Sequence, residues 1–172
     1  MSISESVFEK EIEIRYKGIY DLEGIYKTIR GWLDSNRYDY MEKIHKDKQT
    51  NPWGNEVEWE MVPCRKVDGF IMFYIYIRTK FYDVKEFSSV VHGHKRNVTD
   101  GRFWIEITGV VEYDYGGNFS SEFGKKLLNL IIKKIFKKYF RIYYHERLKA
   151  DIYKLHNEIK EFMKLETAYN AY

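Results

Sequence analysis

The stretch GFIMFYIYIRTKFY (residues 69–82) is apolar on both sides of an extended chain. Successive residues of a β-strand point to opposite faces of its sheet, and a strand covered on one side alternates apolar with polar residues. This stretch therefore predicts a strand with both faces covered, the extra cover coming from the last helix of the chain, a partner subunit or both. One face would carry Ile71, Phe73, Ile75 and Ile77, and the other Phe70, Met72, Tyr74 and Tyr76.

Outward from this stretch, alternating apolar residues predict further strands, and apolar residues at helical spacing predict three helices. Asp21 can cap the first helix, and Ser120 or Ser121 the second. The polar segment HGHKRNVTDG (92–101) is interpreted as a loop, and Gly109 is expected to mark a bulge. The predicted strands are 8–18, 38–46, 56–62, 84–91 and 102–115, and the predicted helices are 21–36, 120–142 and 145–166.

Over residues 8–142, the order of strand, helix, antiparallel strands and long helix resembles the START and Bet v1-like superfamily. In that superfamily a curved antiparallel sheet wraps around a long C-terminal helix, the helix-grip fold, and the cavity between them often holds an apolar ligand. The resemblance implies an α+β domain over 1–142, with a curved sheet of about six strands and a helical extension over 143–172. This chain departs from the pattern by having one helix after its first strand and a further helix at its end.

Composition limits the class of protein. The chain has 172 residues, of which 44% are hydrophobic and 32% charged, as in one folded domain rather than a disordered chain. A single cysteine, Cys64, cannot form an internal disulfide, which favours the cytoplasm. The start MSISESVFEKEIEIR lacks the basic and apolar regions of a signal peptide, and no uncharged apolar run reaches the roughly 18 residues of a membrane span. These features predict a cytoplasmic protein without a transmembrane segment.

The positive charge is concentrated in one segment. The net charge is +3, yet residues 120–142 hold seven basic residues and one acidic residue. On a helical wheel these basic residues lie opposite an apolar stripe, which predicts that the stripe packs on the sheet. The stripe contains Leu128, Ile131, Ile132, Ile135, Phe136, Tyr139 and Ile142.

The basic face of this predicted helix raises the question of a partner. Like charges at i,i+4 repel by a few tenths of a kcal/mol per pair, and here almost no acidic residue relieves them. One interpretation is a solvated face; the other is a surface for nucleic acid, a ribonucleoprotein, anionic lipid or an acidic protein. The predicted anion-binding residues are Lys95, Arg96, Lys125, Lys126, Lys133, Lys134, Lys137, Lys138 and Arg141.

The last predicted helix carries a second apolar seam, from Leu148 to Leu165 in steps of four and three residues. One unbroken helix of about 45 residues would be about 67 Å long, longer than such a domain. Either the chain turns near RIYYHER (141–147) and the seam packs on this domain, or the helix continues and pairs with another chain. The second case predicts a homodimer through 145–166.

The sequence contains no recognisable catalytic, metal or cofactor motif, so binding is favoured over catalysis. His92 and His94 lack a third metal ligand at motif spacing, and Cys64 lacks a visible catalytic partner. The inner face of the sheet is predicted to hold a hydrophobic or amphipathic small molecule, with a filled aromatic core as the alternative. The alternative function is a scaffold that binds nucleic acid or a ribonucleoprotein through the basic helix. The predicted cavity residues are Trp59, Met61, Tyr74, Tyr76, Arg78, Trp104, Glu106 and Thr108.

Overall fold

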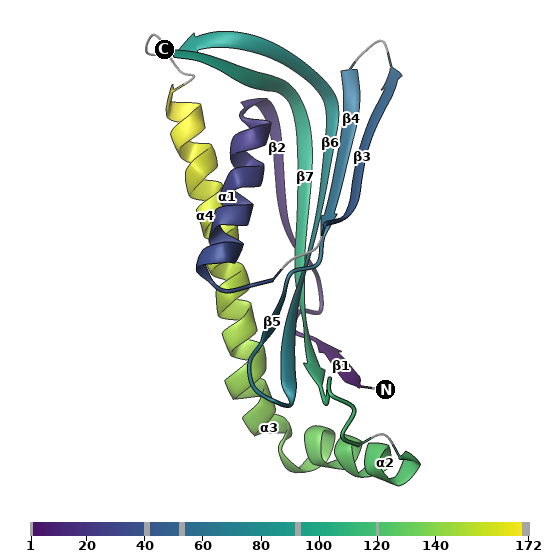
Figure 1. Ribbon diagram of the computed structural model, residues 1–172. Helices are drawn as coiled ribbons and strands as arrows, with labels where there is room; N and C mark the ends of the chain where they lie inside the picture. The colour runs from purple at the N-terminus through teal and green to yellow at the C-terminus, as the bar shows by residue number, and fades with distance from the viewer. Residues whose placement is uncertain (1, 40–41, 52–53, 92–93, 120, 170–172) are drawn as a thin grey trace.

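The computed structural model describes residues 2–39, 42–51, 54–91, 94–119 and 121–169. The side chains of these residues are also described, except those of 42–51, 89–91, 94–96, 133 and 165–169. The chain is an α+β protein: an open antiparallel sheet lies beside helices that include a long C-terminal one (Figure 1).

A long hairpin of two strands, β6 and β7, forms the centre of the sheet (Figure 1). β1 and β2 pair with β7, while β4 and the short β5 pair with β6, and β3 pairs with β4 at one edge. The first long strand therefore lies next to the last. The strands are β1 (Ile3–Ser6), β2 (Ile12–Tyr20), β3 (Glu42–Asn51), β4 (Gly54–Met61), β5 (Cys64–Lys66), β6 (Ile71–Val91) and β7 (His94–Tyr113).

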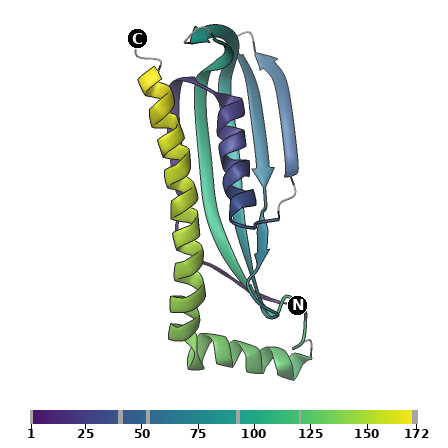
Figure 2. The same ribbon diagram turned by 60° about the vertical axis from the view of Figure 1, so that its left-hand side comes forward.

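The central hairpin is longer than the sequence predicts. The predicted strands 69–82 and 84–91 form one strand, whose pairing with β7 is irregular between Tyr82 and Lys85. Asp83 has a positive φ of 57° at this irregularity. Most of the predicted loop 92–101 belongs to β7. Its residues are polar, but they pair with β6 in an extension of the hairpin, where a strand does not need alternating apolar residues. The extension bends toward the helix side of the sheet (Figures 1 and 2).

The first helix, α1 (Leu22–Ser35), confirms the predicted helix and its cap. Asp21 has extended backbone angles, and its side chain accepts a hydrogen bond from the Gly24 N–H at 2.8 Å. The helix buries Ile25, Ile29, Trp32 and Leu33 against the sheet. Hydrophobic burial of this one face holds α1 in place.

The long helix on the sheet is α4 (Glu146–Tyr169), which lies beside α1 on the same face (Figures 1 and 2). The prediction that helix 120–142 occupies this position is wrong. Four residues of the α4 seam are fully buried, whereas most of the 120–142 stripe is exposed. Gly109 does not mark a bulge, since its pairing with Ile75 is in register; it instead gives room to α4. The seam residues with no exposed area are Leu148, Ile152, Leu155 and Ile159.

Residues 122–145, here called the arm, connect the sheet to α4. Ser121 caps the arm, accepting a hydrogen bond from the Gly124 N–H at 3.0 Å. The helix is interrupted at Phe136 (φ −110°, ψ 17°), where the arm bends in an L, and the part of the arm after the bend continues into α4 (Figures 1 and 2). The chain thus turns five residues before the predicted RIYYHER segment. The arm comprises α2 (Glu122–Leu130), a π-helical turn (Ile131–Ile135), α3 (Lys137–Phe140) and a second π-helical turn (Arg141–His145).

A helix that crosses a lipid bilayer requires about 20 mostly apolar residues. None of the helices in the described ranges is long and apolar enough to cross a membrane.

Candidate functional site

The eight predicted cavity residues lie on opposite faces of the sheet. Trp59 and Met61 face the helices and are 4% and 1% exposed. Trp59 pairs with the buried Thr79, so even-numbered residues of β6 must point to the other, outer face. β7 continues the same alternation. The outer face carries Tyr74, Tyr76, Arg78, Trp104, Glu106 and Thr108.

On the inner face, Trp59 belongs to a packed aromatic cluster. Its ring lies 5.1 Å from that of Tyr26 on α1 and 4.9 Å from that of Phe81, measured between centroids. Phe81 in turn lies 5.6 Å from Phe103. For these residues the arrangement is the filled aromatic core that sequence reasoning considered as the alternative to a cavity.

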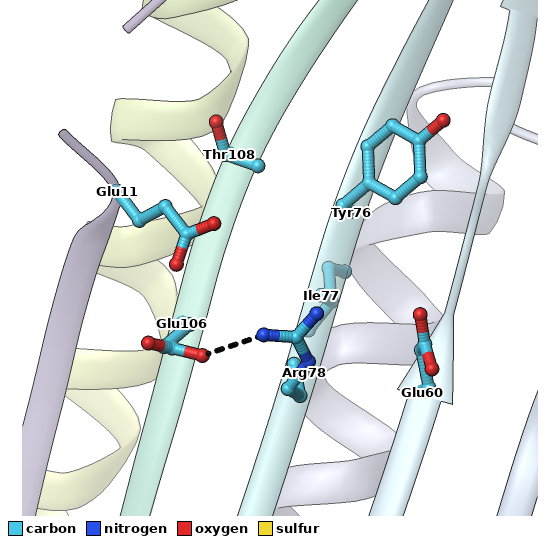
Figure 3. Close-up of a pocket in the computed structure, with 7 residues that line it drawn as sticks. All are labelled: Glu11, Glu60, Tyr76, Ile77, Arg78, Glu106 and Thr108. Carbon is cyan, nitrogen blue, oxygen red and sulfur yellow. Dashed lines mark hydrogen bonds and ion pairs between the residues drawn. The ribbon is translucent and has the colours of Figure 1, made fainter. Parts of the chain in front are cut away.

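Four of the outer-face residues line a small hollow with Glu11 and Glu60 (Figure 3). Arg78 Nη1 lies 3.2 Å from Glu106 Oε2, so its charge is paired. The hollow has a volume of about 20 Å³, room for about one water molecule. It is therefore too small for the predicted ligand. Within the described ranges, no group of three or more His, Cys, Asp or Glu residues is arranged to hold a metal ion.

Cys64 shows no sign of an activated thiol. Burial and the nearby Asp39 raise the pKa of its thiol, although Lys66 acts in the opposite direction. The adjacent Arg65 is paired with Asp151 instead. The pKa of the Cys64 thiol is therefore raised, although two cations follow it in the sequence.

The basic residues of the arm are mostly exposed, as the sequence predicts for that face. Lys126, Lys134, Lys137, Lys138 and Arg141 are exposed and Lys125 is half-buried. The side chains of Lys95, Arg96 and Lys133 lie outside the described residues. The far end of the β6–β7 hairpin lies at the opposite end of the molecule from α2, so the two predicted basic segments are separate (Figure 1).

The arm also exposes an apolar stripe that sequence reasoning missed. Phe123, Leu127 and Leu130 are 76%, 39% and 45% exposed, on the side of α2 opposite the buried Leu128 and Ile132. Their spacing of four and three residues is that of one helical face. This spacing is present in the sequence, but the three residues lie among lysines. The longer apolar stripe from Leu128 to Ile142, on the opposite face, was therefore taken as the apolar side of the helix.

A second group of exposed apolar residues lies around the turn of the arm. All of them except Tyr143 were predicted to pack on the sheet, and α4 has taken that position. Tyr139 and Tyr143 stack on each other, with ring centroids 4.4 Å apart, while remaining open to solvent. The exposed fractions are 59% for Ile135, 50% for Phe136, 49% for Tyr139, 54% for Ile142 and 59% for Tyr143.

The arm therefore combines large exposed apolar side chains with a strong excess of positive charge. Clustered apolar exposure of this kind marks an interaction surface. Comparison with known proteins adds no assignment: no family model matches the chain, and no curated protein shows significant similarity.

Proposed function

We propose that this protein binds anionic membrane surfaces peripherally, through its arm. The observation that carries the proposal is that the arm exposes eight large apolar side chains together with most of its lysines. An amphipathic helix with this composition lies in the interface of a bilayer, with apolar side chains among the acyl chains and lysines at the headgroups.

The apolar stripe favours a membrane over the other anionic partners. Nucleic acid would satisfy the lysines through its phosphates but would leave Phe123, Leu127 and Leu130 in water. A bilayer satisfies both, since each basic residue near an anionic surface contributes about 1 kcal/mol. Burial of a Leu or Phe side chain contributes roughly 1.5–3 kcal/mol more. Lys126 and Lys134 flank the stripe, where their long side chains can reach the headgroups.

We further propose that the sheet and α4 are a variant of the helix-grip architecture. The position of β2 next to β7, and of α4 along one face of the sheet, supports this proposal. The carrier function predicted from the sequence stays a prediction. Its residues are divided between the two faces of the sheet, so we rank it below membrane binding.

Co-sedimentation with vesicles tests the proposal. We expect the protein to sediment with vesicles of phosphatidylcholine and phosphatidylglycerol, and to remain in solution with phosphatidylcholine alone. Replacing Phe123, Leu127 and Leu130 together by Ser should abolish sedimentation. Ile19→Ser is the matched control, because Ile19 is 38% exposed on β2, away from the arm.

The charge requirement is tested separately. Replacing Lys134, Lys137 and Lys138 by Glu should abolish vesicle binding, whereas Glu at Lys154 and Lys160, which are exposed on α4, should not. Absence of vesicle binding by the unmodified protein, together with salt-sensitive retention of RNA, would reject the membrane in favour of nucleic acid. Equal loss of binding in the α4 control would show that only net charge matters.

A further inference from the structure

A second basic region lies where the turn after α1, strand β5 and the start of α4 meet. It contains an open cavity of about 380 Å³, within the range of small-molecule sites. The sequence did not suggest it, because its residues come from three distant segments and form no motif. The lining residues are Asn36, Arg37, Asp39, Arg65, Lys66, Val67 and Arg147.

One wall of the cavity is rigid because Arg65 is held on several sides. Its Nη2 lies 2.5 Å from Asp151 Oδ2, and its Nη1 donates to the Asn36 carbonyl at 3.1 Å. Its guanidinium lies over the ring of Tyr38, 4.4 Å from the centroid, and the Tyr38 hydroxyl donates to Asp151 at 3.1 Å. Both charged side chains are largely buried, at 16% and 11% exposure. This network fixes the backbone and α4 around the opening.

The other cations are free to meet a ligand. Among the described residues, neither Arg37 nor Arg147 is paired with a carboxylate, and both are exposed. Arg37 is positioned by a left-handed backbone (φ 59°) and by its N–H, which donates to the Asp34 carbonyl at 3.1 Å. Lys66 lies over the ring of Tyr115, with Nζ 5.8 Å from the centroid.

The charge balance of the cavity favours an anionic ligand. The lining has four cations and one carboxylate, Asp39, which leaves +3. Asp151 balances Arg65, so the net charge offered to a ligand is about +2. A phosphate monoester carries about −1.5 to −2 at neutral pH and accepts the paired N–H groups of arginine.

We propose that this cavity binds the phosphate monoester group of a small molecule or of a lipid headgroup, with Arg37 and Arg147 as its principal contacts. Arg147 is the second residue of α4, which begins where the arm ends, so the phosphate of a lipid headgroup is one possible source of the ligand. A free phosphorylated compound would use the same contacts. The site does not depend on the proposed membrane function, since none of its lining residues belongs to the arm.

Calorimetric titration with glycerol 3-phosphate tests the site without any membrane. We expect saturable binding at one site, weakened by about tenfold or more in Arg37→Asn and in Arg147→Gln. Asn accepts the left-handed backbone at position 37, so the first variant removes charge without strain. Lys154→Gln, on the exposed side of α4, should bind as the unmodified protein does. No saturable binding, or equal weakening by Lys154→Gln, would overturn the proposal.

A second experiment distinguishes the two sources of phosphate. Vesicles with phosphatidic acid present a monoester, whereas vesicles with phosphatidylglycerol present a diester. A preference for phosphatidic acid that is lost in Arg37→Asn/Arg147→Gln would identify a headgroup. Binding of glycerol 3-phosphate with no such preference would identify a free compound, and either result supports the site. The Ser variant of the arm should retain glycerol 3-phosphate binding, which separates failure of the membrane proposal from failure of this one.

Discussion

A Cβ atom on Gly109 of β7 would lie 2.5 Å from Cδ1 of Ile152 on α4. The same atom would lie 3.1 Å from Leu148 Cδ2, while the Gly109 carbonyl accepts a hydrogen bond from the Val7 N–H at 2.9 Å. The absence of a side chain at this position therefore allows α4 to approach the sheet closely. Because protein interiors are closely packed, a side chain added at position 109 would displace the residues around it.

Gly109→Ala should lower the free energy of unfolding by about 1–3 kcal/mol, because the added methyl group overpacks the α4 contact. Urea denaturation measures the loss. The double variant Gly109→Ala/Ile152→Val removes the clashing Cδ1. Its loss in free energy of unfolding should be smaller than the sum of the losses in the two single variants. Gly31→Ala is the control, since a Cβ there meets nothing within 4 Å. A Gly109→Ala protein as stable as the unmodified one would contradict the close approach of α4.

Asp151→Ala should be among the most destabilising single changes in the chain. It leaves the buried Arg65 guanidinium without its partner, at an expected cost of about 3–5 kcal/mol. Replacing both Arg65 and Asp151 by Met should recover much of this loss, because no charge is then left unpaired. The exposed pair Glu23–Lys27, 2.7 Å apart, is the control, and Glu23→Ala should cost under about 1 kcal/mol. Similar losses for both pairs would argue against burial of the Arg65–Asp151 pair.

The orientation of the arm predicts opposite outcomes for neighbouring leucines. Leu128 is 3% exposed and Leu127 is 39% exposed. Leu128→Ala should therefore cost about 2–5 kcal/mol, as buried leucines do. Leu127→Ala should cost under about 1 kcal/mol while reducing vesicle binding. Thermal unfolding of both variants checks the prediction, and a larger loss for Leu127→Ala would place the stripe against the protein rather than in solvent.

Acid should destabilise the fold through His145. Burial lowers the pKa of His145 below its ordinary 6.5, an effect that Glu5 opposes and that Lys149 and Arg141 reinforce. The pKa of Tyr113 is raised by burial, and its hydroxyl forms a hydrogen bond with His145 Nε2 at 2.9 Å. Below about pH 6.5 the unfolded state then binds more protons than the folded state, and stability falls with pH.

Denaturation curves from about pH 8 to about pH 5.5 test this dependence. His145→Gln should be less stable at pH 8 but should lose less stability on acidification. His156, whose pKa is also lowered by burial, should retain its own contribution in that variant. An unchanged pH dependence in His145→Gln would exclude His145 as the group responsible.

Local periodicity predicted much of the secondary structure. The Asp21 and Ser121 caps and the helix α1 follow from side-chain chemistry within a few residues, which a sequence displays directly. The short strands β1 and β5 were missed because three or four residues carry too little alternation to detect. The β6–β7 extension was missed because its pairing, rather than its composition, makes it a strand.

The α+β class, the amphipathic character of three helices and the concentration of positive charge in residues 120–142 follow from the amino-acid sequence alone. The tertiary fold selects which apolar helix packs on the sheet, because the 120–142 stripe and the α4 seam are both suitable and the space at Gly109 admits α4. It also placed Trp59 and Tyr76 on opposite faces, since alternation within a strand does not specify its register with the next. The cavity of Arg37, Arg65 and Arg147 likewise exists only after folding, which brings together segments far apart in the chain.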